Sequence, residues 1–75
     1  MRLVKIVWVD ACGADGFITM EELQKETPVV HNSVGYVVKE TEAFITITMS
    51  FNDELDNLGA WMLVPKIMIT KITEM

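Results

Sequence analysis

Residues 34–51 read VGYVVKETEAFITITMSF. Both ends of this stretch are rich in β-branched and aromatic residues, and the polar triplet at 40–42 separates them, which is typical of a β-hairpin. In the second half, one set of alternate positions is apolar: Ala43, Ile45, Ile47, Met49 and Phe51. The other set carries one aromatic ring and three hydroxyl groups: Phe44, Thr46, Thr48 and Ser50. Because successive side chains of a strand point to opposite faces, the apolar set is predicted to face the core.

Similar composition recurs on both sides of this hairpin. Strands are predicted over residues 3–10, 59–64 and 67–73, and a single 3₁₀-like turn is predicted at the Pro65-Lys66 step between the last two. Residues 10–16 form a turn-rich loop after the first strand. Thr19 and Glu22 then have the spacing of a capping box, which predicts one short helix over residues 20–26 that ends before Thr27-Pro28.

These elements predict a mainly β chain. Five short strands, a central hairpin and a one-turn break before the last strand are typical of a small, strongly bent antiparallel barrel of the SH3-like or Sm-like kind, here with one short helix after the first strand. An open five-stranded sheet with the helix packed on one face is the alternative. At 75 residues the chain has room for a single domain, residues 1–75.

Composition limits the classes of partner. The chain is 51% hydrophobic with a formal net charge of −5, and its mean hydropathy is +0.32. A chain this short buries little surface alone, so the apolar excess predicts a homo-oligomer. The six basic residues are scattered singly and form no basic stripe, so long nucleic acid is not an expected partner.

The N-terminus predicts neither a membrane span nor a signal sequence. Its apolar stretch is short, and Lys5 and Asp10 interrupt it. The single cysteine, Cys12, excludes an internal disulfide and fits a reducing compartment, and it leaves a disulfide between subunits open. We therefore expect a cytoplasmic protein that does not bind membranes.

Catalysis is not expected. The only nucleophilic pair available is Cys12 with His31, and the acidic neighbours Asp10 and Asp15 disfavour the thiolate that a reactive cysteine needs. His31 is instead predicted to lie in a turn beside Asn32.

No metal or cofactor is expected either. Residues 15–23 match the second half of an EF-hand loop, with Asp15 and Glu22 at ligand positions. Ala11 and Gly13 stand where the first two ligands of that loop would be, and neither side chain offers an oxygen. A turn that runs into a capped helix accounts for the same residues.

Three segments together resemble a widespread set of short phage-encoded accessory proteins. They are residues 7–12 (VWVDAC), residues 33–40 (SVGYVVKE) and residues 62–66 (MLVPK), the last followed by Ile69 and Ile72. Such proteins typically show a Trp-x-Asp strand end, a Gly-aromatic strand that closes in glutamate, and an Ile-Pro step near the C-terminus, where this chain has Val64-Pro65. The resemblance implies an early role in host takeover or counter-defence, and the set includes anti-CBASS-like sponges that sequester cyclic nucleotide signals.

A cyclic oligonucleotide would need aromatic rings for its bases and cations for its phosphates. The candidate stacking residues are Trp8, Tyr36 and Trp61, and the candidate phosphate-binding residues are Arg2 and Lys66. The net charge of −5 opposes an anionic ligand unless cations converge locally.

The Thr-rich strand face supplies the candidate subunit interface, Phe44, Thr46 and Thr48, because an exposed aromatic residue on such a face is typical of a contact surface. Two other functions remain open. The acidic loop at residues 53–56 could bind a basic patch on a host enzyme as an inhibitor, or the chain could be a structural, virion-associated subunit with no small ligand.

Overall fold

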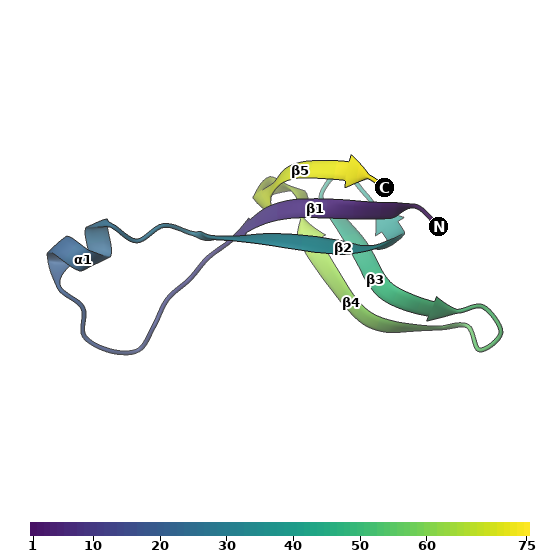
Figure 1. The fold of residues 1–75 in the computed structure, drawn as a ribbon, viewed down its shortest axis with the longest axis horizontal. Helices are drawn as coiled ribbons and strands as arrows, with labels where there is room; N and C mark the ends of the chain where they lie inside the picture. The colour runs from purple at the N-terminus through teal and green to yellow at the C-terminus, as the bar shows by residue number, and fades with distance from the viewer.

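The structure is a computed structural model that describes all residues, 1–75. Its elements in chain order are β1 (Leu3–Asp10), α1 (Met20–Gln24), β2 (Val29–Glu40), β3 (Phe44–Asn52), β4 (Asn57–Pro65), η1 (Lys66–Met68) and β5 (Ile69–Glu74) (Figure 1). The strands form one antiparallel sheet in the order β4-β3-β2-β1-β5. The predicted mainly β chain with five antiparallel strands, one short helix after the first strand and a 3₁₀ turn before the last is confirmed. The sheet is open, because β4 and β5 are its two edges.

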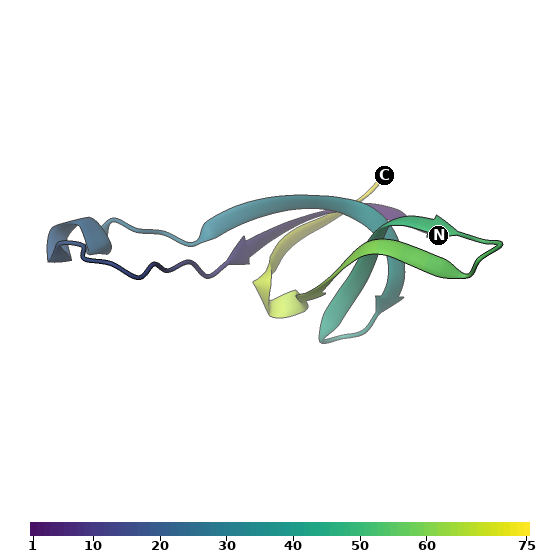
Figure 2. The same ribbon diagram turned by 90° about the horizontal axis from the view of Figure 1, so that it is seen from below.

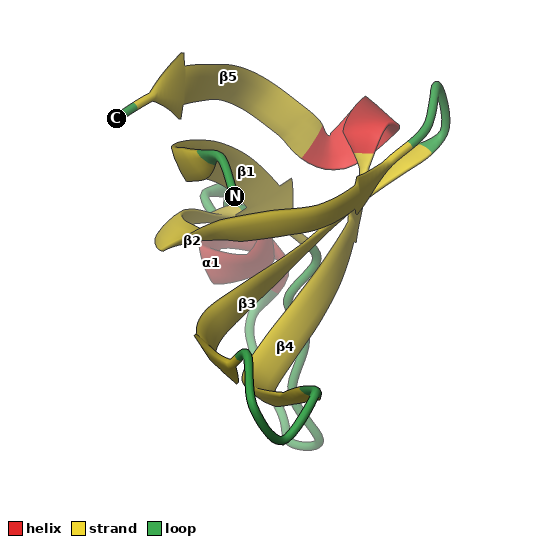
Figure 3. Cartoon of the chain, turned by 90° about the vertical axis from the view of Figure 1, so that its right-hand side faces the viewer, coloured by secondary structure: helices red, strands yellow, loops and turns green.

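The sheet is strongly bent. Figure 3 shows the β3–β4 hairpin crossing the direction of β1, β2 and β5 at a steep angle. The strand register shifts between Val7 and Trp8 where β1 pairs with β5, and between Val37 and Lys39 where β2 pairs with β3. Such bulges bend a strand and increase its local twist, so they account for the curvature.

The core lies on the concave inner face of this bent sheet. Five apolar side chains are buried there: Val4, Ile6, Ile45, Ile47 and Val64. Cross-strand pairing joins them, since Ile45 lies opposite Val64 and Val4 lies opposite Gly35. A Cβ at Gly35 would come within 2.9 Å of the Thr48 carbonyl oxygen, so the close approach of β2 to β3 requires a glycine.

The predicted buried face of residues 43–51 is confirmed for Ile45 and Ile47, while Phe51 is only partly buried. It is wrong for Ala43, which is exposed and precedes β3, and for Met49, whose side chain is 69% exposed. The pairing explains the difference. β2 pairs with β3 only as far as Thr48, so the rest of β3 and its partner β4 extend beyond the other strands. Nothing covers Met49 there.

β2 is longer than the sequence predicts. It begins at Val29 instead of residue 34, because residues 29–33 continue the ladder with β1. His31 is therefore a strand residue opposite Trp8, and its predicted place in a turn is wrong.

Residues 11–28, which we call the arm, leave the sheet and return to it at the pair formed by Asp10 and Val29. Figures 1 and 2 show the arm, with α1 near its tip, projecting away from the strands. The capping box is confirmed: the backbone N–H of Glu22 donates to Thr19 Oγ1 at 3.1 Å, and that of Thr19 to the Glu22 carboxylate at 3.4 Å. α1 has no buried residue, so the alternative with a helix packed on the sheet is not observed.

The projecting arm makes the molecule elongated. It measures 54 × 23 × 20 Å, and its radius of gyration is 16.0 Å. A compact chain of this length has a radius of gyration of about 11 Å. None of its helices has the length and apolar character needed to cross a membrane.

Candidate functional site

The two cations predicted to bind phosphate lie together, but carboxylates already hold both. Glu40, the last residue of β2, lies 2.7 Å from Arg2 Nη1 through one oxygen and 2.7 Å from Lys66 Nζ through the other. Arg2 also pairs with Glu74 at the end of β5, where its Nε donates at 3.0 Å. The hydrogen bonds from Lys66 and then Arg2 lower the pKa of Glu40, and those to Glu74 and then Glu40 raise the pKa of Arg2.

Two cations and two carboxylates leave this cluster without net charge. A phosphate that binds there would compete with Glu40 and Glu74 for the same two cations. The structure therefore assigns Arg2 and Lys66 a role in linking the N-terminus, β2, η1 and β5, and it offers no unpaired cation at this point.

Trp8 lies on the inner face, away from the other two predicted stacking residues. Its ring stacks on His31 with the centroids 4.6 Å apart, and it packs against the core. Its Nε1 donates to Ser33 Oγ at 3.0 Å. Both the ring and its polar atom are thus already engaged by the protein.

Tyr36 and Trp61 lie together on the opposite, outer face. Each is directly paired with Thr48, Tyr36 from β2 and Trp61 from β4, so the three residues form one row across the sheet. Trp61 is 70% exposed, while Tyr36 is partly buried and packs its ring edge to face on Phe51 at 5.1 Å. Two of the three predicted aromatic residues therefore share one surface.

The predicted interface residues Phe44 and Thr46 lie on this outer face as well. Thr46 lies between Lys39 and Leu63, in the row next to that of Tyr36 and Trp61. Thr48 differs, because it is fully buried and its hydroxyl lies 2.6 Å from the Gly59 carbonyl oxygen. The expected contribution of Thr48 to an interface surface is therefore corrected: the hydroxyl joins β3 to β4.

Lys39 is a candidate site residue that the sequence pattern did not predict. Strict alternation would place Lys39 and Tyr36 on opposite faces, but the bulge between Val37 and Lys39 brings both to the outer face. Its Nζ lies 5.7 Å from the centroid of the Phe44 ring, within the range of a cation–π contact. Lys39 takes part in no ion pair, in contrast to Arg2 and Lys66.

We define the outer patch as the exposed and partly buried side chains that surround the row through Thr48: Tyr36, Lys39, Phe44, Thr46, Trp61 and Leu63. It combines three aromatic rings with one unpaired ammonium group. Such a surface can stack on a flat ring and can attract a nearby anion.

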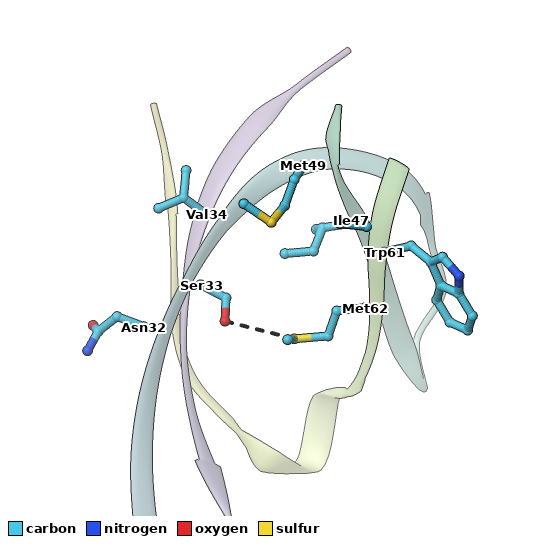
Figure 4. Close-up of a pocket in the computed structure, with 8 residues that line it drawn as sticks. Asn32, Ser33, Val34, Ile47, Met49, Trp61 and Met62 are labelled. Carbon is cyan, nitrogen blue, oxygen red and sulfur yellow. Dashed lines mark hydrogen bonds between the residues drawn. The ribbon is translucent and has the colours of Figure 1, made fainter. Parts of the chain in front are cut away.

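A second candidate surface lies on the inner face. An open cavity of about 410 Å³ is bordered by β2, β3 and β4, and none of its lining residues is charged. Figure 4 shows Ser33, Ile47, Met49 and Met62 pointing into it, whereas Trp61 and Asn32 point away. The Ser33 hydroxyl lies 3.8 Å from Met62 Sδ across the cavity. We call this hollow the inner cavity.

Cys12 and His31 do not form a catalytic pair. Cys12 lies in the arm, and its thiol donates to the Thr27 carbonyl at 3.6 Å. His31 pairs with Trp8 within the β1–β2 ladder, whereas Cys12 lies beyond the last pair of that ladder, Asp10 with Val29. His31 Nε2 instead lies 3.7 Å from the Asp10 carboxylate.

Acidic side chains gather at the two ends of the long axis. The turn between β3 and β4 carries three of them: Asp53, Glu54 and Asp56. The arm carries four against a single lysine, namely Asp15, Glu21, Glu22 and Glu26. The acidic charge therefore does not form one continuous surface.

Compared with known protein families, curated proteins and solved structures, the chain matches none.

Proposed function

We propose that this chain is a non-catalytic binding protein that acts as a homo-oligomer and sequesters a cyclic nucleotide on the outer patch. The observation that carries the proposal is the row formed by Tyr36, Thr48 and Trp61, with the unpaired Lys39 in the next row. Aromatic side chains on an open sheet face stack nucleobases regardless of their sequence. The ammonium group of Lys39 supplies a cation that no carboxylate of the chain neutralises, in contrast to Arg2 and Lys66.

A second copy is part of this proposal. A cyclic dinucleotide carries two phosphates, whereas one outer patch carries one unpaired lysine. Two outer patches that face each other would supply a cation for each phosphate and aromatic rings for both bases. The ligand would then lie where two copies meet.

The wider setting rests on the resemblance to short phage proteins. We propose a counter-defence role for the chain in the cytoplasm of the infected host cell.

The barrel of SH3-like or Sm-like kind is also a proposal. The order β4-β3-β2-β1-β5 and the position of η1 before β5 support it, and closure would require the β4 and β5 edges to come together.

The test is a thermal-shift and calorimetry panel with cyclic di- and trinucleotides on the purified chain. At a hundredfold excess over the dissociation constant, linkage predicts about 2.7 kcal/mol of stabilisation. Trp61→Ala should weaken binding roughly five- to 150-fold, since stacking contributes about 1–3 kcal/mol per base. Lys39→Gln should also weaken it, while Lys71→Gln, which alters an unpaired lysine outside the patch, should not.

Two results would contradict the proposal. One is a panel in which no nucleotide raises the melting temperature. The other is binding that Lys66→Gln abolishes and Lys39→Gln leaves unchanged. That result would place the phosphate site at Arg2 and Lys66, the cations predicted from the sequence, and not at the outer patch.

An acidic inhibitor of a host enzyme is the second candidate. The exposed turn with Asp53, Glu54 and Asp56 supports it, because three carboxylates at a protruding tip can bind a basic patch. Such binding should weaken steeply with added salt, whereas stacking on the outer patch should persist. A chain that binds neither nucleotide nor host protein would fit the structural, virion-associated subunit.

A further inference from the structure

The arm carries large apolar side chains that nothing in the same chain covers. Phe17 is fully exposed, and three other apolar residues of the arm are about half exposed or more: Ile18, Met20 and Leu23. α1 has only five residues and no buried side chain. A helix of this length is not stable alone in water, so its capping box needs support from packing.

The arm has no packed interior of its own. Its two halves enclose a cavity of about 610 Å³, which is bordered by Phe17, Leu23 and Val29 among others. Residues 11–28 are exposed throughout. The apolar surface of the arm therefore calls for a partner outside its own chain.

The inner cavity has complementary properties. It is apolar, has no charged lining residue and is open to solvent, with Met49 at its border 69% exposed. Methionine side chains adapt to irregular partners, and their sulfur atoms make favourable contacts with aromatic rings. A phenyl ring is therefore a suitable occupant of a cavity that Met49 and Met62 border.

We propose that the arm of one copy packs Phe17 and its apolar neighbours into the inner cavity of a second copy of this chain. The proposal rests on the homo-oligomer of the proposed function and gives it a second contact, which forms without ligand and is separate from the outer patches that meet across the ligand. The occupant is a second copy because each chain carries both the arm and the cavity. Reciprocal exchange between two copies covers both surfaces and closes the assembly.

The accessible surface of the chain is large enough for such a contact between two copies. The chain exposes 5927 Å², and a compact monomer of its mass exposes about 4,700 Å². The difference is about 1,200 Å² per chain, which exceeds the roughly 800 Å² that each partner contributes to an interface of standard size. The outer patch lies on the other face of the sheet, so arm exchange leaves it available.

The first experiment is sedimentation of the wild type and two variants, with circular dichroism to verify folding. Phe17→Asp should raise the dissociation constant of the oligomer at least tenfold. The matched control is Ile67→Asp, because Ile67 in η1 is also apolar and 95% exposed but lies outside the arm. This control should leave the oligomer unchanged.

The second experiment does not depend on a destabilising charge. Chains with Phe17→Cys and Cys12→Ser are mixed, under mild oxidation, with isotopically labelled chains that carry Met49→Cys and Cys12→Ser. A disulfide needs Cα atoms within about 7 Å, so a mixed disulfide should form in high yield with Cys at 49. It should not form when the second chain carries Ile67→Cys instead.

The outcomes separate the two proposals. A monomeric wild type would overturn both the homo-oligomer and the arm exchange. Two other results would overturn the arm exchange alone. One is an oligomer that persists in Phe17→Asp, and the other is a mixed disulfide that forms equally at positions 49 and 67 or at neither. Nucleotide binding would still be tested separately by the thermal-shift and calorimetry panel.

Discussion

The carboxylate of Glu40 lies 2.7 Å from the ammonium group of Lys66 and joins the end of β2 to η1. The same carboxylate accepts a hydrogen bond from Arg2, which in turn pairs with Glu74 at the end of β5. These ion pairs link segments that are far apart in the sequence. Arg2 and Lys66, which the sequence predicts to bind phosphate, are therefore paired with carboxylates of the same chain.

Replacing Glu40 with glutamine should lower the melting temperature at neutral pH, because Lys66 and Arg2 lose their shared partner. The pKa of Glu40 is lowered from its ordinary value of 4.5, chiefly by the hydrogen bond from Lys66 and then by that from Arg2. The stability that this carboxylate provides is therefore fully present above pH 4.5 and is lost as the pH falls through the lowered pKa. The melting temperatures of the wild type and the variant should converge in that acidic range.

Glu42→Gln provides the control for this pH series, since Glu42 is an exposed carboxylate that forms no ion pair. Its melting temperature should follow that of the wild type at every pH. A difference between wild type and Glu40→Gln that stays constant down to pH 2 would contradict the role of Glu40.

Trp8 and Trp61 should respond very differently to replacement by alanine. Trp8→Ala removes a ring that packs on the core and donates to Ser33, so it should destabilise the fold by about 2–4 kcal/mol. Trp61→Ala removes a side chain that is 70% exposed and should cost less than about 1 kcal/mol. Urea unfolding followed by circular dichroism measures both. Equal losses would show that the two rings are not divided between the inner and outer faces as described.

Gly35 should not tolerate a methyl group. A Cβ there would meet the Thr48 carbonyl oxygen at 2.9 Å and the Ile47 side chain at 3.1 Å, so Gly35→Ala forces β2 away from β3. Overpacking of this kind costs about 1–3 kcal/mol. Gly13→Ala is the matched control, because a Cβ at Gly13 has no atom within 4 Å and the backbone φ is not positive. A Gly35→Ala protein as stable as Gly13→Ala would contradict the close approach of these strands.

Replacing Ala60 with glycine should leave the stability of the fold unchanged or raise it slightly. Its φ of 41° lies in the left-handed region, which costs a residue with a Cβ about 1–2 kcal/mol. Ala60→Gly removes this strain, and the greater flexibility of the unfolded chain offsets about 0.5–1 kcal/mol of the gain. The variant should therefore unfold at equal or slightly higher urea concentration than the wild type. Ala14→Gly, at an exposed arm position whose φ is not positive, should shift the midpoint the other way.

Much of the fold can be predicted from neighbouring residues alone. The β-branched run at residues 3–10 predicts β1 with its observed bounds, and the pair Thr19 and Glu22 predicts the capped start of α1. Pro65 predicts the break before the last strand, where η1 follows. These features depend on backbone propensities and on hydrogen bonds over three or four residues, so they are encoded locally.

The candidate site depends instead on contacts between distant strands. The bulge in β2 turns Lys39 to the face of Tyr36, and strand pairing separates Trp8 from Trp61. Likewise, Arg2 meets Glu40 across 38 positions of sequence. A strict period of two does not reveal a bulge, and composition does not reveal which carboxylate a cation will pair with, because both follow from how the strands align in space.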